Sequence, residues 1–200
     1  ESILVKNQVS RRMGMAWSAL HMRLLYRSPK SSMAQSGAYW KNDKDNKMLA
    51  LNLPAYDTKI TVNDGKRQIF DTLRRCYVAL TPEEWVRQHF VHYLLDYKGY
   101  PAALMGNEIA ITLNGMNRRC DTVVYDKALK PRVIIEYKAP TVKITKEVFA
   151  QISRYNLILK VDYLIVSNGL QHYCCKMDYA NNSFTFLQEI PEYNKIIEML

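Results

Sequence analysis

The sequence contains no long hydrophobic run, and none of its 200 residues lies in a stretch approaching the ~18 apolar residues of a membrane-spanning helix. A secretory signal is also missing, because the first residues lack a compact apolar stretch followed by a small-residue cleavage site. The four cysteines, Cys76, Cys120, Cys174 and Cys175, follow no disulfide framework, and the last two are adjacent, which is poor geometry for bonding each other. We therefore expect reduced thiols, no membrane partner and a cytoplasmic location.

The composition supports a folded chain but says little about partners. Hydrophobic residues make up 48% and aromatic residues 11% of the sequence, which excludes a disordered protein, and the length suits one ordinary domain. The formal net charge is +9, yet residues 1–47 alone hold nine basic and three acidic residues and so supply +6 of it. Bulk charge is therefore weak support for nucleic-acid binding, and function must be argued from a site.

Residues 1–47 differ in composition from the rest of the chain. They are rich in Arg, Ser and Met, and Arg11 to Arg27 has the pattern of a basic amphipathic helix. A nucleic-acid arm and a transit-like segment are two interpretations. The composition favours a third, an upstream extension that is disordered or not part of the native chain, with the natural start at Met48. We expect residues 48–200 to form the domain.

From Met48 onward, turn and capping signals predict a regular order of elements. Asn63-Asp64-Gly65 indicates a hairpin between residues 58–62 and 66–70. Thr81-Pro82-Glu83-Glu84 is typical of a helix start, and that helix should end near Tyr97. The elements expected after it are strands 108–113, 119–125 and 132–138, a helix 145–159, a strand 161–166, strands 171–177 and 183–187, and a short helix after Pro191. The predicted fold is an α/β core of helix, three-strand meander, helix and strand, with an added C-terminal hairpin.

Three charged residues on neighbouring predicted strands form the candidate site. Alternation along a strand places Glu136 and Lys138 on one face, and an antiparallel neighbour would bring Asp121 beside Glu136. Two converging carboxylates are the hard oxygen ligands that Mg²⁺ and Mn²⁺ prefer. A metal held there polarises a phosphate oxygen and lowers the pKa of a bound water, while the Lys138 ammonium orients that water or stabilises the phosphate. This pattern points to phosphodiester hydrolysis.

Taken together, these segments resemble the PD-(D/E)XK nuclease superfamily, and within it the N-terminal nuclease domain of type I restriction enzyme R subunits. The matching segments are Arg119-Cys120-Asp121, residues 135–140 (Ile-Glu-Tyr-Lys-Ala-Pro), and Gln151 to Tyr155, which fits a Gln-x-x-x-Tyr motif. The helix that opens at Pro82 also looks like that domain's first helix, with a Glu four residues before an Arg. The resemblance covers roughly residues 48–193 and implies a restriction-endonuclease-like fold. Cys120 stands where the superfamily pattern has Pro.

The resemblance adds supporting residues to the site. It implies that Gln151 contacts the metal site or DNA, and it draws attention to Tyr155, whose alternative role is core packing. It also implies that a first-helix Glu joins the metal ligands. A helical wheel puts Glu83 on the inward face and turns Glu84 away, so we choose Glu83, although both could simply complement the helix dipole.

For the other charged residues, a functional role competes with an ordinary structural one. Arg118 and Arg119 are candidate phosphate contacts, although loop charges are usually just solvated. Glu108, at the start of a strand, has two interpretations, a further member of the acidic cluster and a surface charge, and we favour the surface charge. A zinc site of His89 and His92 with the adjacent cysteines lacks any paired ligand spacing and is rejected.

The function predicted is therefore a Mg²⁺-dependent DNA endonuclease, with Mn²⁺ expected to substitute. Asp121, Glu136 and Glu83 bind metal, Lys138 and Gln151 complete the catalytic set, and Arg118, Arg119 and Tyr155 contact DNA. The alternatives are a catalytically inactive nuclease-fold module that binds nucleic acid or a partner, and another metal-dependent phosphoesterase. No Gly-x-x-x-x-Gly-Lys-Ser/Thr loop is present, so a helicase or methyltransferase subunit is expected to be encoded separately.

Overall fold

The computed structural model describes residues 49–113 and 115–198. Its first elements are three strands that form a small antiparallel sheet. It has the order β1 (Ile60–Asn63), β2 (Lys66–Asp71) and β3 (Cys76–Ala79). Asp64 and Gly65 join the first two strands with φ of 48° and 72°, the left-handed pair that a tight hairpin turn requires. The expected hairpin is confirmed, while β3 was missing from the sequence prediction.

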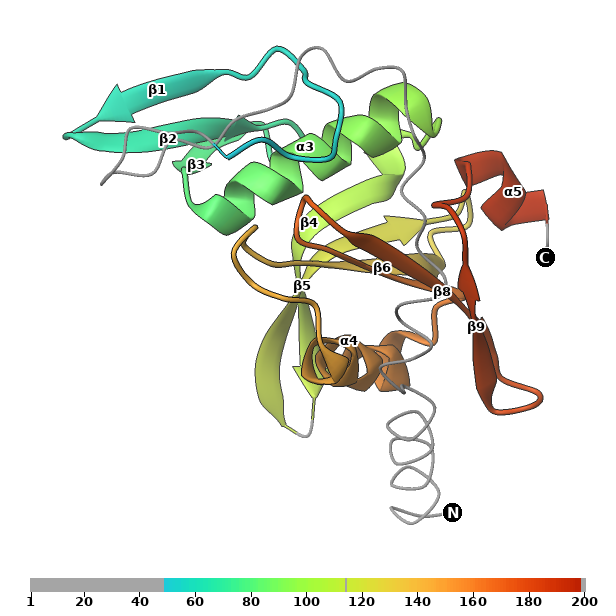
Figure 1. Cartoon of the computed structure of the whole chain (residues 1–200). Coiled ribbons are helices and arrows are strands. Elements are labelled where there is room, and N and C mark those ends of the chain that lie inside the picture. The colour runs from blue at the N-terminus through green and yellow to red at the C-terminus, as the bar shows by residue number, and fades with distance from the viewer. Residues whose placement is uncertain (1–48, 114, 199–200) are drawn as a thin grey trace.

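Helix α3 (Pro82–Tyr97) follows this sheet and lies between it and a larger sheet (Figure 1). The Thr81 hydroxyl accepts a hydrogen bond from the Glu84 backbone N–H at 3.1 Å, and Pro82 occupies the first turn, where no backbone N–H is needed. Every residue from Glu84 to Val91 is buried. This follows from packing on two sides, because α3 contacts both β2 and β6.

The larger sheet has six strands in sequence order, and a single parallel pair interrupts its antiparallel neighbours. The short 3-10 turn η1 (Ala102–Leu104) leads into it. Its members are β4 (Met105–Leu113), β5 (Met116–Tyr125), β6 (Pro131–Tyr137), β7 (Tyr163–Ser167), β8 (His172–Asp178) and β9 (Ser183–Leu187). The parallel pair is β6 and β7, joined by the crossover helix α4 (Lys146–Leu159), and α5 (Tyr193–Glu198) comes last. Two neighbouring parallel strands need such a crossover, because the chain must return to the same end of the sheet and a tight turn joins only antiparallel strands.

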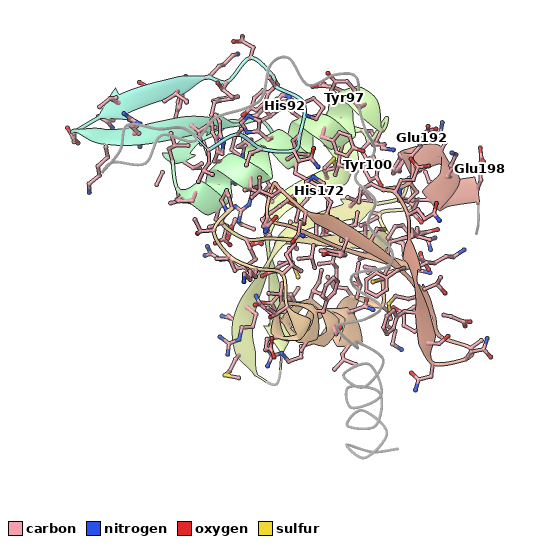
Figure 2. All side chains as sticks on the ribbon, viewed as in Figure 1. His92, Tyr97, Tyr100, His172, Glu192 and Glu198 are labelled. Atoms are coloured by element: carbon pink, nitrogen blue, oxygen red, sulfur yellow. The ribbon has the colours of Figure 1, made fainter. Side chains whose placement is uncertain are left out.

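The sheet is covered on both faces, which explains why β6 is apolar almost throughout. Ile135 and Tyr137 belong to a core cluster with Phe90 of α3. Ile134 points the other way, into a cluster with Ile152 of α4. Side chains that alternate along the strand therefore pack into two cores, one on each face of the sheet, and side chains fill both layers (Figure 2).

The mixed α/β class is confirmed, and the order helix, three strands, helix, strand is present as α3, β4, β5, β6, α4 and β7. The two strands expected at the C-terminus are present as β8 and β9, which continue the same sheet. The extension predicted for residues 1–47 lies outside the described residues. In residues 49–113 and 115–198, no helix combines the length and apolar character needed to cross a bilayer.

Candidate functional site

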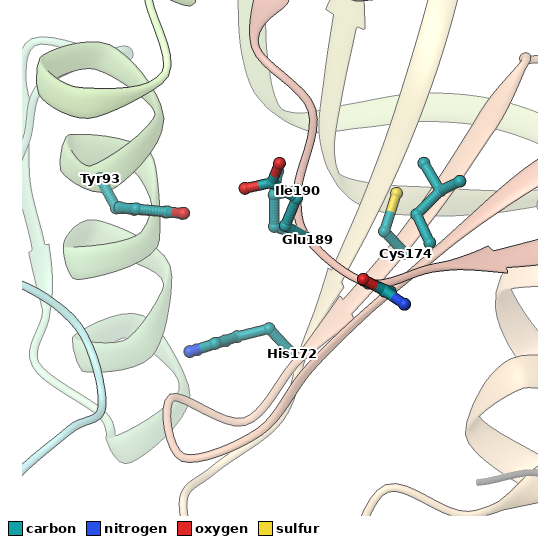
Figure 3. A pocket seen from close by; sticks show the side chains of 7 residues that line it. Tyr93, His172, Cys174, Glu189 and Ile190 are labelled. Atoms are coloured by element: carbon teal, nitrogen blue, oxygen red, sulfur yellow. The ribbon is translucent and has the colours of Figure 1, made fainter. Parts of the chain in front are cut away.

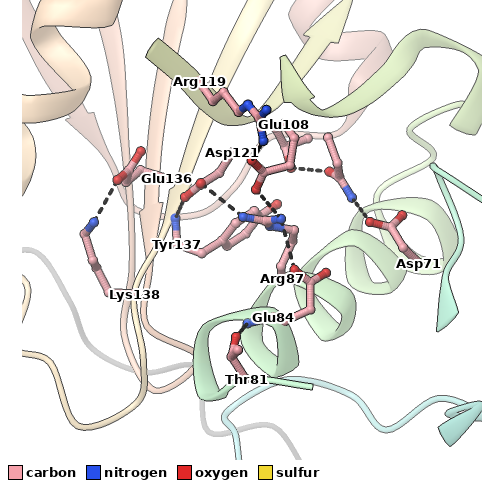
Figure 4. A network of polar contacts seen from close by, with 12 residues as sticks. Asp71, Thr81, Glu84, Arg87, Glu108, Arg119, Asp121, Glu136, Tyr137 and Lys138 are labelled. Carbon is pink, nitrogen blue, oxygen red and sulfur yellow. Dashed lines mark hydrogen bonds and ion pairs between the residues drawn. The ribbon is translucent and has the colours of Figure 1, made fainter. Parts of the chain in front are cut away.

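The pairing of β5 with β6 brings the two predicted metal-ligand carboxylates together. Thr122 pairs with Ile135, so the next residues along, Asp121 and Glu136, lie opposite each other. The Asp121 Oδ2 accepts a hydrogen bond from the Tyr137 backbone N–H at 2.8 Å (Figure 4). Glu136 is 2% exposed, so its carboxylate lies almost wholly within the protein. The expected juxtaposition is therefore present.

Two more predicted residues converge on a single oxygen of Glu136. The Lys138 ammonium lies 2.8 Å from Glu136 Oε1, and the Gln151 side-chain amide donates to the same oxygen at 2.6 Å. Lys138 follows β6 directly, whereas Gln151 comes from the first half of α4. Tyr155 joins them one helical turn later, with its hydroxyl 3.4 Å from Gln151 Nε2. Strand alternation and helix spacing thus assemble the set that the sequence predicted.

The carboxylates of this site are crowded and poorly solvated. Burial raises the pKa of Glu136 to about 7, and the neighbouring Asp121 charge adds to the effect. Burial likewise raises the pKa of Asp121 and of Glu83, with repulsion from nearby carboxylates contributing. Burial alone would lower the pKa of Lys138, but its hydrogen bond to Glu136 raises it, so the ammonium stays charged. A site of this kind favours the arrival of further positive charge.

The helical wheel placed Glu83 on the inward face and Glu84 on the outward face, and only the placement of Glu84 disagrees with the structure. Glu83 is half-buried and makes no hydrogen bond or ion pair with any residue the structure describes, and Asp121 and Lys138 both act on its charge. Glu84 was expected to face away, and this is wrong. It is buried and contacts Arg74, Arg87 and Gln88, because the β1–β3 sheet covers that side of α3. Glu83 remains the first-helix carboxylate with free oxygens beside Asp121.

Arg87 is a central residue of the site to which the sequence interpretation gave no role. It is 5% exposed. Its Nη1 lies 3.0 Å from Glu84 and 2.6 Å from Glu108, and its Nη2 lies 3.1 Å from Asp121 Oδ1 (Figure 4). Burial would lower the pKa of Arg87, but these three carboxylates raise it, so the guanidinium stays charged. The available signal was its spacing, four residues after Glu83 on the same helix.

Glu108 corrects another expectation, since it is not a plain surface charge. Besides Arg87 it faces Arg119 at 3.8 Å, and its register position in β4 is opposite Asp121. Its φ of 56° is a left-handed conformation that non-glycine residues rarely adopt within a strand. The β4–β5 register is unchanged on either side of Glu108, and the Glu108 and Asp121 carboxylates both contact Arg87 of α3.

A second polar chain connects the small sheet to the strand that carries Asp121. Asp71 of β2 is fully buried and accepts a hydrogen bond from Asn107 at 2.9 Å. Asn107 in turn accepts one from the Thr122 hydroxyl at 2.6 Å. The Asp71 carboxylate also accepts the backbone N–H of Arg74, whose guanidinium reaches Glu84 at 3.3 Å. The small sheet is therefore bonded to the site through buried polar side chains.

The predicted DNA contacts are brought together only in part. Arg119 is 71% exposed at the side-chain level and borders the site through Glu108, and Tyr155 borders it through Gln151. Arg118 is exposed, and its guanidinium donates a hydrogen bond to the Met116 sulfur, away from the candidate site. Whether any of them touches DNA stays a prediction.

Of the residues of the rejected zinc site, His89 and His92 both pack against Tyr56, whereas the two cysteines lie elsewhere. His89 packs against Trp85 and Tyr56, and the adjacent cysteines lie in two different cores. A small hollow between α3 and residues 187–190 is lined by Tyr93, His172, Cys174, Leu187, Gln188, Glu189 and Ile190 (Figure 3). It shares no residue with the candidate site.

The donor chemistry fits a hard divalent cation, but the ligands are not preassembled. Asp121, Glu136 and Glu83 offer only carboxylate oxygens, and the raised pKa values of all three reflect charge that a cation would offset. Within residues 49–113 and 115–198, however, no three His, Cys, Asp or Glu side chains are close enough together to hold a metal ion. Glu83 would have to move toward the Asp121–Glu136 pair.

Comparison with known proteins gives a match to a family model and matches to solved structures. A family model described as "Type I restriction enzyme R protein N terminus (HSDR_N)" matches residues 82–191, more than half of the chain, and includes all the residues assigned above to the metal and Lys138. A solved fragment of a protein assigned as the HsdR subunit of a type I restriction enzyme from Vibrio vulnificus YJ016 is 18% identical, with a TM-score of 0.44. The match covers 59% of this chain and 25% of that one, and at this similarity it does not establish a shared fold. No curated protein matches.

Proposed function

The chain belongs to the family of the type I restriction enzyme R protein N terminus (HSDR_N), and on that premise we propose that it is a Mg²⁺-dependent DNA nuclease domain of the PD-(D/E)XK type. The observation that carries the proposal is the convergence on Glu136. Asp121 lies opposite it, and Lys138 and Gln151 both reach its Oε1. These four residues come from β5, β6, the end of β6 and α4, so no single local sequence pattern explains why they lie together.

In the proposed mechanism, Asp121, Glu136 and Glu83 hold the metal. When bound, the metal supplies Lewis-acid polarisation of the scissile phosphate and a lowered pKa for the attacking water. Lys138 releases Glu136 and turns its ammonium toward the water or the phosphate oxygens, where positive charge stabilises the transition state. Gln151 keeps Glu136 oriented through its amide hydrogen bond. Tyr155, Arg118 and Arg119 contact the DNA backbone.

Membership of a restriction enzyme family implies that the domain acts on DNA together with other subunits. Which subunits these are is part of our proposal. The chain spans about a quarter of the length of the Vibrio vulnificus fragment that it matches. We propose that a helicase or a methyltransferase partner acts on DNA together with this domain. Without a base-reading motif in the domain, its own DNA contacts are to phosphates, and binding should weaken steeply with salt.

The test is cleavage by the purified full chain of supercoiled plasmid and of a single-stranded oligonucleotide. Mg²⁺ and Mn²⁺ are titrated, with EDTA as the control. The proposal expects metal-dependent cleavage of at least one substrate. DNA binding without cleavage under any metal would instead favour the inactive nuclease-fold module. Arg87 gives that alternative some weight, because its guanidinium already neutralises part of the Asp121 charge.

A further inference from the structure

We propose that the outward face of the β1–β3 sheet binds single-stranded DNA. This deepens the proposed function and rests on it for the identity of the nucleic acid, because it names the form of DNA that the domain holds. The sheet lies outside the residues that the family model matches. The inference therefore depends on the side chains of residues 59–79.

Strand alternation separates the two faces of this sheet. Ile69 and Asp71 of β2 are fully buried against the rest of the protein. Their neighbours along β2, Lys66, Gln68 and Phe70, therefore point to the opposite face. The registers add Thr61 and Asn63 from β1 and Tyr77 and Ala79 from β3 to that same face.

The outward face combines aromatic rings with ammonium groups. Phe70 and Tyr77 contact edge to face, with ring centroids 5.4 Å apart, and Tyr77 is 45% exposed. Lys59, directly before β1, lies with its Nζ 5.6 Å from the Phe70 centroid. Lys66 is exposed at the other end of β2. An exposed aromatic side chain beside cations is what unstacked bases and their phosphates require.

The charge of this face is complementary to a polyanion. No strand residue on it carries a carboxylate, because the acidic residue of β2, Asp71, points inward. The nearest acids are Asp64 in the β1–β2 turn and Asp57 before Lys59. Duplex DNA hides its base faces within the stack, so the exposed ring favours a single strand over a duplex.

The sheet is joined to the candidate site at its other end. The turn between β2 and β3 carries Arg74, which contacts Glu84 at 3.3 Å, and Glu84 contacts Arg87 beside Asp121. Arg75, in the same turn, is exposed with a φ of 54° and makes no ion pair among the described residues. Ion pairs therefore connect the β2–β3 turn of the proposed binding sheet to the carboxylate of Asp121 in the candidate site.

The experiment measures binding without cleavage. Fluorescence anisotropy follows the full chain, in EDTA, binding a labelled oligodeoxythymidine 20-mer and a duplex of equal length. Tyr77→Ala should weaken single-strand binding at least about fivefold, the lower end of what one stacked base contributes, and leave duplex binding within about twofold. Tyr77→Phe keeps the ring and should bind like the wild type. Lys66→Ala should reduce the slope of log affinity against log salt by about 0.7 for the single strand.

The matched control is Tyr97→Ala, because Tyr97 is 50% exposed at the far end of α3 (Figure 2). It should leave both affinities unchanged, and Lys195→Ala should leave the salt slope unchanged. Single-strand affinity unaffected by Tyr77→Ala would overturn the inference, and so would an equal loss for the duplex or for Tyr97→Ala. Because no metal is present, a chain that never cleaves DNA can still support the inference, and an active nuclease can still contradict it.

Discussion

The guanidinium of Arg87 lies 3.1 Å from Oδ1 of Asp121, so a buried cation from α3 already faces the first of the predicted metal ligands. The same group contacts Glu84 and Glu108, so three carboxylates share a single guanidinium. Arg87 therefore links the packing of α3 to the charge of the site. Removing the Arg87 guanidinium should therefore lower the stability of the fold by a measurable amount.

Replacing Arg87 with Met should lower the free energy of unfolding by about 3–5 kcal/mol, because the buried Glu84 and the partly buried Asp121 and Glu108 lose their shared partner. Urea unfolding measures the change, and exposed Arg154→Met on α4 is the control, expected within about 0.5 kcal/mol of the wild type. Adding Glu108→Gln to Arg87→Met should recover part of the loss, as a double-mutant cycle would report. A loss below about 1 kcal/mol for Arg87→Met would contradict this account.

Gly169→Ala should destabilise the protein more than Gly65→Ala. Both glycines have a left-handed φ, of 80° and 72°, which costs an L-residue about 1 kcal/mol. A Cβ at Gly65 meets nothing within 4 Å, whereas one at Gly169 would lie 2.6 Å from Leu51 and 3.0 Å from Val86. The difference between the two free energies of unfolding isolates the steric term. Equal losses of unfolding free energy in the two variants would show that Leu51 and its neighbours shift at little cost to make room for the added methyl group.

His172 should make stability depend on pH in the acid range. Its Nε2 donates to the Asn52 carbonyl at 3.1 Å, its Nδ1 accepts from Ser167 at 2.8 Å, and burial lowers its pKa to about 4. The unfolded chain takes up the proton near pH 6.5, so this stability is complete above that pH and is lost as pH falls toward 4, by about 1.4 kcal/mol per unit.

The measurement is the difference in unfolding free energy between the wild type and His172→Gln from pH 7.5 to 4. His89, whose pKa burial also lowers to about 4, is present in both proteins, so its titration cancels. The difference should shrink steadily below pH 6.5. A constant difference would mean that the pKa of His172 is the same in the folded and unfolded states, so that burial does not lower it.

Local patterns made much of the site predictable, whereas residues far apart in sequence determined the rest. The positions of Glu136 and Lys138 follow from strand alternation, and the start of α3 follows from the Thr81 cap, both of which depend only on neighbouring residues. Glu84 was misplaced because its burial depends on the β1–β3 sheet packing over α3. The left-handed φ of Glu108 could not be predicted either, because no turn residue marks this position and its contact with Arg87 joins β4 to α3.

Asp121→Asn should weaken Mg²⁺ binding at least about tenfold, because losing a direct ligand costs no less than losing an outer hydrogen-bond partner. The asparagine can still accept the Tyr137 N–H, so the β5–β6 pairing should survive. Calorimetric titration of Mg²⁺ measures the change. Asp64→Asn, in the exposed β1–β2 turn, is the control, since asparagine tolerates the left-handed φ there. Unchanged Mg²⁺ affinity in Asp121→Asn would remove Asp121 from the metal site.

The central claim is that Lys138 acts on the reaction and not on metal binding, because an ammonium cannot ligate a cation. The deciding measurement compares the single-turnover cleavage rate of Lys138→Ala with those of the wild type and of Lys195→Ala, an exposed lysine on α5. Lys138→Ala should lose about 10²–10³ in rate while its half-saturating Mg²⁺ concentration stays unchanged, and Lys195→Ala should cleave normally. Cleavage by Lys138→Ala at the wild-type rate would contradict the assigned site.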